Sequence, residues 1–157
     1  MSQGLLTDQI KDAIQDAYRT WLLAREFKPR RGQREMIAQI ARTLGQADSR
    51  ICVIEAGTGT GKTAAYCIAA IPLAKHIGKT VVLSTATVAL QEQVVLQDLP
   101  DLKQRAGLTF SVSLAKGRGR YLCLKRLDDH PKYQNQQEIP IFDATDEDFS
   151  VLYQEML

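Results

Sequence analysis

The chain has 157 residues, of which 45% are hydrophobic, 24% charged and 6% aromatic, and these are the proportions of an ordinary globular domain. The formal net charge is only +2, yet residues 1–129 carry 19 basic and 12 acidic side chains, and residues 130–157 carry one basic and six acidic side chains. A basic body favours an anionic partner. We expect neither a membrane-spanning helix nor a secretory signal. Three scattered cysteines exclude a disulfide framework and favour a reducing cytoplasm.

Two amphipathic helices are predicted at the start of the chain. Apolar residues recur at three- and four-residue steps from Leu6 to Leu22, which predicts the first helix. Pro29 breaks the pattern because proline disfavours a helical conformation at the residue before it. The apolar face from Met36 to Leu44 predicts the second helix, and Gly45 supplies its carboxyl-terminal stop.

Strands and helices then alternate along the chain. Residues 50–55, 80–84 and 109–114 are short apolar segments typical of strands that are covered on both faces. Helices are predicted between them, over 62–76, closed by Gly78, and over 88–97, with Leu90, Val94 and Val95 facing inward. This order favours an α/β fold with a parallel sheet and right-handed crossovers.

The composition changes after Leu114. Five basic side chains and no acidic one lie within residues 116–126, and a polar stretch follows. A last helix is predicted from Thr145, because Thr145 and Asp148 have the spacing of a capping box. The basic segment could bind nucleic acid, or it could be an ordinary solvated surface.

The strongest motif is a glycine-rich segment between the first predicted strand and the helix that follows it. It matches the phosphate-binding loop pattern G-x-x-x-x-G-K-S/T, except that alanine replaces the first glycine. Alternate glycines let several backbone N–H groups face phosphate oxygens, and the helix adds its positive end. Lys62 and Thr63 are the candidate catalytic residues, the first for the β- and γ-phosphates and the second for Mg²⁺. The predicted nucleotide-binding residues of the loop are Ala56, Gly57, Thr58, Gly59, Thr60, Gly61, Lys62 and Thr63.

Gln33 is the candidate reader of the nucleotide base. Arg30 followed three positions later by Gln33 resembles the Q motif of superfamily 2 helicases. A carboxamide donates and accepts hydrogen bonds at once, which suits the N6 and N7 edge of adenine. The resemblance implies that Gln33 selects ATP; the alternative is a polar residue at a helix start.

Residues 81–93 resemble motif Ia of the same helicases, with a strand, a threonine-rich turn and the pattern L-Q-x-Q. In that family this element binds the backbone of single-stranded DNA. The resemblance therefore assigns DNA contacts to Thr85, Thr87 and Gln91. Either threonine could instead serve only as a helix cap.

Residues 114–123 resemble the entry to the iron–sulfur domain in the XPD and DinG branch of superfamily 2. The resemblance implies that Cys123 is the first of four thiolate ligands to a 4Fe–4S cluster. Arg118 and Arg120 lie close to it in the sequence and could meet DNA or the cluster sulfurs. The alternative for Cys123 is an inert thiol.

Together, these motifs resemble the amino-terminal part of bacterial DinG-type helicases over residues 27–127. The resemblance implies a RecA-like fold and an ATP-driven, 5′-to-3′ DNA helicase of the cytoplasm that acts in DNA repair on single-stranded or forked DNA and on R-loops. It divides the chain into amino-terminal helices with the Q motif (1–45), the first part of a RecA-like ATP-binding domain (46–115), and the start of an iron–sulfur-type insertion (116–157).

Several parts of such a motor do not occur in the sequence. The D-E-x-H acid pair, a second RecA-like domain and three further cluster cysteines are missing. We therefore expect this chain to be the front part of a longer helicase and, alone, to bind ATP weakly and to hydrolyse it negligibly. Two alternatives stay open: a truncated nucleic-acid-binding module without catalysis, whose affinity would fall steeply with salt, and a small P-loop kinase.

Overall fold

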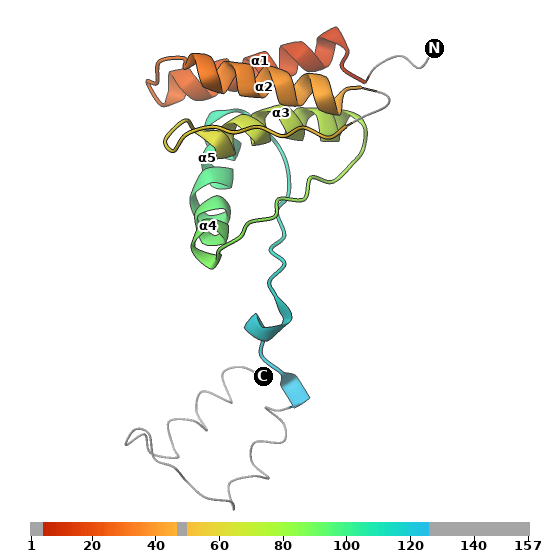
Figure 1. Ribbon diagram of the computed structural model, residues 1–157, viewed down its shortest axis with the longest axis vertical. Helices are drawn as coiled ribbons and strands as arrows, with labels where there is room; N and C mark the ends of the chain where they lie inside the picture. Colours follow the sequence, from red (N-terminus) through yellow and green to blue (C-terminus); the bar gives the residue numbers. More distant parts are fainter. Residues whose placement is uncertain (1–4, 47–49, 126–157) are drawn as a thin grey trace, which may run out of the picture. The chain divides into compact units, whose positions relative to one another are not determined.

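The computed structural model describes residues 5–46 and 50–125 (Figure 1). The helix predicted from Thr145 and the acidic residues after 130 lie outside the described residues. The chain divides into two compact units, Met1–Leu114 and Ala115–Leu157. In the described part, no helix is long and apolar enough to cross a membrane.

The first unit begins with two helices, α1 (Asp8–Ala24) and α2 (Arg31–Leu44). Both helices were predicted from the spacing of their apolar residues, and both are confirmed. The Thr7 hydroxyl caps α1 by accepting a hydrogen bond from the Ile10 amide. Gly45 ends α2 as predicted, but for a different reason. Its φ is −81° rather than left-handed, and a Cβ on Gly45 would lie 2.6 Å from the Leu6 Cβ. Glycine is needed here because the chain before α1 passes so close.

Helix α3 (Lys62–His76) occupies the centre of the unit and packs against both α1 and α2. It has the predicted bounds, and Gly78 follows it with a φ of +62°. Its middle turns are buried on most sides, which explains why residues 64–74 are almost entirely apolar. The buried residues of α3 are Ala65, Cys67, Ile68, Ala69, Ile71 and Leu73.

The helix predicted over 88–97 is longer than expected and is built in three parts. Helix α4 (Val88–Gln93) continues as a π-helical segment, η1 (Val94–Asp98), and then as α5 (Leu99–Arg105). Val94 is buried as predicted, whereas Leu90 is 40% exposed, so its predicted inward position is wrong. Helix α5 was not predicted from the sequence; Pro100 lies in its first turn, where proline is tolerated.

The three predicted strands do not appear as strands among residues 5–46 and 50–125. The first segment is extended and crosses in front of α3 in the view of Figure 1. Cys52 and Ile54 pack against the core, whereas Ile51 and Val53 are 83% and 92% exposed. One face of this segment is therefore covered by helices and the other is bare. A parallel strand needs hydrogen-bonded neighbours and cover on both faces, and the described residues supply cover on one face only.

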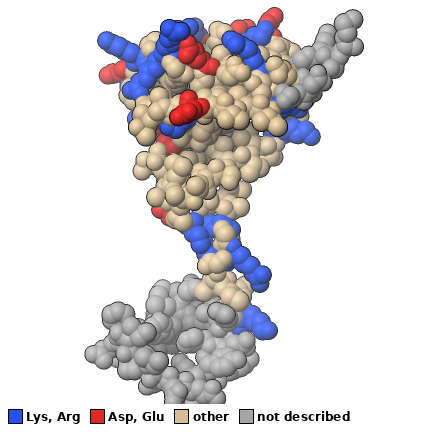
Figure 2. Space-filling model, in the orientation of Figure 1, with Lys and Arg blue, Asp and Glu red and all other residues tan. Residues whose placement is uncertain are grey.

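The described part of the second unit, residues 115–125, is short and exposed. It contains one 3₁₀ turn, η2 (Arg118–Arg120). The Tyr121 hydroxyl accepts a hydrogen bond of 2.9 Å from the Lys116 amide across this turn. Figure 2 shows the lysine and arginine side chains of this segment standing out in blue.

Candidate nucleotide-binding site

The glycine-rich loop curls back directly before α3. Gly59 and Gly61 both have a φ of +76°, a left-handed conformation that costs glycine little and other residues much more. Gly61 is the N-cap of α3, so the loop leads straight into the positive end of that helix. The Thr60 hydroxyl donates a hydrogen bond of 2.8 Å to the Gly57 carbonyl and tightens the turn. A loop of this kind at a helix N-terminus can bind an anion.

Lys62 folds back over this loop. Its ammonium donates hydrogen bonds of 2.9 Å to the carbonyl oxygens of Ala56 and Gly57. These are neutral acceptors, and a phosphate oxygen would make the stronger, charge-assisted bond. The donor set of the loop therefore fits the phosphates of a nucleotide.

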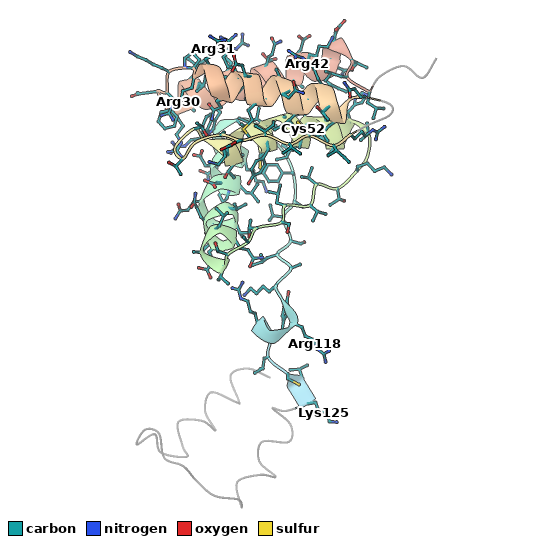
Figure 3. The ribbon with its side chains drawn as sticks, in the orientation of Figure 1. Arg30, Arg31, Arg42, Cys52, Arg118 and Lys125 are labelled. Atoms are coloured by element: carbon teal, nitrogen blue, oxygen red, sulfur yellow. The ribbon has the colours of Figure 1, made fainter. Side chains whose placement is uncertain are left out.

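Gln33 joins α2 to the loop. Its side chain is only 4% exposed, and its Nε2 donates a hydrogen bond of 3.2 Å to the Gly61 carbonyl. Its Oε1 accepts a hydrogen bond of 3.0 Å from the Tyr18 hydroxyl on α1. Arg30, labelled at the start of α2 in Figure 3, donates to the Gly59 carbonyl. The structure thus brings the two halves of the predicted base and phosphate site together.

A pocket of about 440 Å³ lies over these groups. It combines aromatic, cationic and polar side chains, which is the mixture expected where a charged ligand with a flat ring is bound. Of the predicted nucleotide-binding residues, five lie in its wall, namely Gln33, Gly59, Gly61, Lys62 and Thr63. Its full lining is Trp21, Leu22, Phe27, Lys28, Arg30, Gln33, Gly59, Gly61, Lys62, Thr63, Ala64, Gln93 and Asp98.

Asp98 and Gln93 are pocket residues to which the sequence analysis gave no role. The Gln93 amide donates a hydrogen bond of 3.4 Å to the Asp98 carboxylate. Burial raises the pKa of Asp98, against the opposing effect of hydrogen bonds with Gln93 and Thr63. The π-helical segment delivers this carboxylate to the pocket. The spacing of residues in the sequence does not predict that Asp98 reaches the pocket, because its position depends on how the π-helical segment packs.

The pocket wall formed by α1 is fixed by an aromatic cluster. The Trp21 indole donates a hydrogen bond of 2.7 Å to Asp101 on α5, and its ring meets Phe27 edge to face at 5.7 Å. Arg25 lies over the Phe27 ring and pairs with Asp101 at 3.1 Å. Phe27 is 48% exposed, so its ring also has a free surface for a ligand.

Comparison with known proteins identifies the family. Residues 30–151 match the sequence profile of the DEAD/DEAH box helicases. The chain belongs to the DEAD/DEAH box helicase family. It is 40% identical over 145 residues to the ATP-dependent DNA helicase DinG of Photobacterium profundum, covering 88% of this chain and 21% of that protein. It is 48% identical over 103 residues to the DinG proteins of Salmonella typhimurium and Escherichia coli, covering 65% of this chain and 14% of theirs.

The predicted DNA-contacting residues lie around the start of α4. The Thr87 hydroxyl accepts a hydrogen bond of 3.2 Å from the Leu90 amide and therefore caps α4. The Thr85 hydroxyl donates to the Thr87 carbonyl at 3.3 Å. Gln91 lies on α4 and is half-buried. The capping role of Thr87 is confirmed, and the DNA contacts of all three stay predictions.

The predicted ligand of an iron–sulfur cluster lies in the second unit. Cys123 is exposed, whereas Cys52 is half-buried and Cys67 is buried. Arg118 and Arg120 are the ends of the exposed turn η2. Among the described residues, no three cysteine, histidine or acidic side chains come together as a metal site. Cys123 as an iron ligand therefore stays a prediction.

Proposed function

We propose that this chain forms the ATP-binding amino-terminal part of an ATP-dependent DNA helicase. The observation that carries the proposal is the pocket itself, because Gln33 on α2 and Lys62 and Thr63 at the start of α3 line one cavity although they lie far apart in the sequence. The DinG relatives are named as ATP-dependent DNA helicases, and the chain spans about a fifth of the length of one of them and about a seventh of the others.

ATP with Mg²⁺ is the ligand that the pocket fits. The backbone of the 56–63 loop and the Lys62 ammonium would hold the phosphates, and the Thr63 hydroxyl would hold the metal ion. Mg²⁺ would supply charge that neutralises the phosphate oxygens. Gln33 would read the adenine edge while the Phe27 ring offers the base an apolar surface.

We further propose that the bare extended segments become strands in the complete protein. Val82, in the segment predicted as the second strand, is 85% exposed, and Ile51 and Val53 of the first segment are 83% and 92% exposed. Apolar side chains with this alternation fit a sheet whose second face is covered by later residues. A RecA-like parallel sheet would supply that cover. In that arrangement residues 46–115 are the first part of the ATP-binding domain, preceded by the helices of 1–45 and followed by the insertion that starts at 116.

The DNA-facing roles belong to the same proposal. Thr85, Thr87 and Gln91 would contact the backbone of single-stranded or forked DNA, with Arg118 and Arg120 adding positive charge. In the complete protein, Cys123 would be the first ligand of an iron–sulfur cluster. Movement from 5′ to 3′, action on R-loops and a cytoplasmic location follow from the family resemblance and are proposed on that ground.

The test compares the full-length protein that contains these residues with the 157-residue chain. ATP hydrolysis is measured with and without single-stranded DNA. We expect DNA-stimulated hydrolysis by the full-length protein, its loss in Lys62→Ala because the phosphates lose their cation, and negligible hydrolysis by the short chain. DNA-stimulated turnover by the short chain would contradict its incompleteness. Phosphoryl transfer to a small acceptor, with no response to DNA, would instead indicate a kinase.

A further inference from the structure

Tyr18 contacts the proposed base reader from outside the loop and outside the Q motif. It lies on α1, and its hydroxyl donates a hydrogen bond of 3.0 Å to Gln33 Oε1. Its ring also stacks on Trp21, with centroids 6.5 Å apart, and Trp21 lines the pocket. The hydrogen bond is partly buried and the Gln33 side chain is 4% exposed. Water is therefore a poor substitute for Tyr18 as the partner of this amide oxygen.

The orientation of the Gln33 amide is set by two neighbours, the Gly61 carbonyl on one side and the Tyr18 hydroxyl on the other. The Gly61 carbonyl can only accept a hydrogen bond, so the nitrogen of the amide must face it. The oxygen must then face Tyr18, whose hydroxyl can donate to it. The two contacts together define which end of the amide is donor and which is acceptor.

Each end of the amide keeps one further hydrogen-bonding position. The oxygen has a second lone pair and the nitrogen has a second hydrogen. Adenine presents an amino donor at N6 and an acceptor at N7, which match these two positions. Guanine presents an acceptor at O6 in place of the amino group, and that oxygen would face the oxygen of Gln33. An amide locked in this orientation therefore accepts adenine and rejects guanine.

We propose that Tyr18 is a positioning residue for base selection, which holds Gln33 Oε1 where it accepts a hydrogen bond from the amino group of adenine. The inference rests on the proposed ATP-binding function. Without the hydroxyl, the Gly61 carbonyl alone orients the amide, and the position of its oxygen is less closely defined. The preference for adenine over guanine then falls, while the affinity of the loop for phosphates stays the same.

The experiment measures equilibrium binding of ATP, GTP and inorganic tripolyphosphate to the full-length protein and its Tyr18→Phe variant. Phenylalanine keeps the ring contact with Trp21 and removes only the hydroxyl. We expect the ratio of ATP to GTP affinity to fall by about three- to tenfold, the usual worth of one hydrogen bond. Binding of tripolyphosphate, which has no base, is expected to be unchanged. Tyr121→Phe is the matched control, because it removes a tyrosine hydrogen bond in the second unit.

A second measurement places Tyr18→Phe in a Gln33→Ala background. If Tyr18 acts through Gln33, the tyrosine change has no further effect on the ATP to GTP ratio there. An unchanged ratio in the single variant would overturn the inference. So would an equal loss of affinity for ATP, GTP and tripolyphosphate, which indicates a merely structural role. Wild-type protein that binds none of the three ligands would overturn the proposed function itself.

Discussion

At the scale of single residues, the pocket depends on how closely Gln33 approaches Gly61. An added Cβ on Gly61 would lie 2.3 Å from the Gln33 Nε2. The position therefore requires glycine twice, once for its left-handed backbone and once for space. The phosphate loop and the proposed base reader therefore pack directly against each other.

The cysteines Cys67 and Cys123 should differ in their reactivity toward a thiol reagent. Burial raises the pKa of Cys67 to about 12, and Asp98 adds a smaller effect in the same direction. Only the thiolate is nucleophilic, and the Cys67 thiol stays protonated until the pH approaches that value. We expect iodoacetamide at pH 8 to label the exposed Cys123 of the 157-residue chain at least about tenfold faster than Cys67.

Peptide mass spectrometry of the labelled chain measures both rates. Labelling in urea is the control, because unfolding exposes Cys67 and should make the two rates similar. Rapid labelling of Cys67 in the folded chain would contradict its burial in α3.

At the scale of helices, the contact between α1 and α5 holds the pocket wall. Asp101 is 14% exposed and accepts a hydrogen bond from the Trp21 indole, while Arg25 and Arg105 pair with it at 3.1 Å and 3.3 Å. Both arginines are more than a third exposed, so solvent screens their ion pairs and these contribute little. The charge-assisted bond from Trp21 is therefore the main interaction.

The Asp101→Asn variant should lower the free energy of unfolding by about 1–2 kcal/mol, as measured by urea denaturation. The amide keeps an oxygen but loses the charge that strengthens the Trp21 bond. Asp16→Asn is the matched control, because Asp16 pairs with Arg19 at 2.8 Å on the exposed surface of α1 and is 64% exposed. We expect this control to cost less than about 0.5 kcal/mol. A larger effect at Asp16 than at Asp101 would contradict the role given to the helix contact.

The helices and the phosphate loop could be predicted from the sequence because their signals are local. The period of the apolar residues gave α1 and α2, and the loop motif gave the start of α3 at Lys62. The roles of Tyr18 and Asp98 could not be predicted, because their contacts with Gln33 and Thr63 join separate elements. The predicted strands depend even more on distant partners, since a strand is defined by the neighbours to which it bonds.

At the scale of the whole molecule, the uncovered apolar face of the predicted strands determines how readily the isolated chain self-associates. In the view of Figure 2, charged side chains cover α1 and α2, whereas uncharged atoms cover much of the remaining surface of the first unit. Val53 and Val82 are 92% and 85% exposed. Exposed apolar side chains on extended backbone are a risk for self-association. If the proposed sheet forms in the full-length protein, the same side chains are buried there.

The Val53→Lys variant should therefore have opposite effects in the two contexts. In the 157-residue chain it should reduce self-association, as measured by analytical ultracentrifugation, because a charge replaces an exposed apolar group. In the full-length protein it should lower the free energy of unfolding by about 3 kcal/mol or more, because an unpaired charge is placed in the core. Leu23→Lys is the matched control, since Leu23 is 73% exposed on α1 and lies outside the predicted strands. If the full-length protein tolerates Val53→Lys as well as Leu23→Lys, residue 53 is not covered there and the proposed strand is wrong.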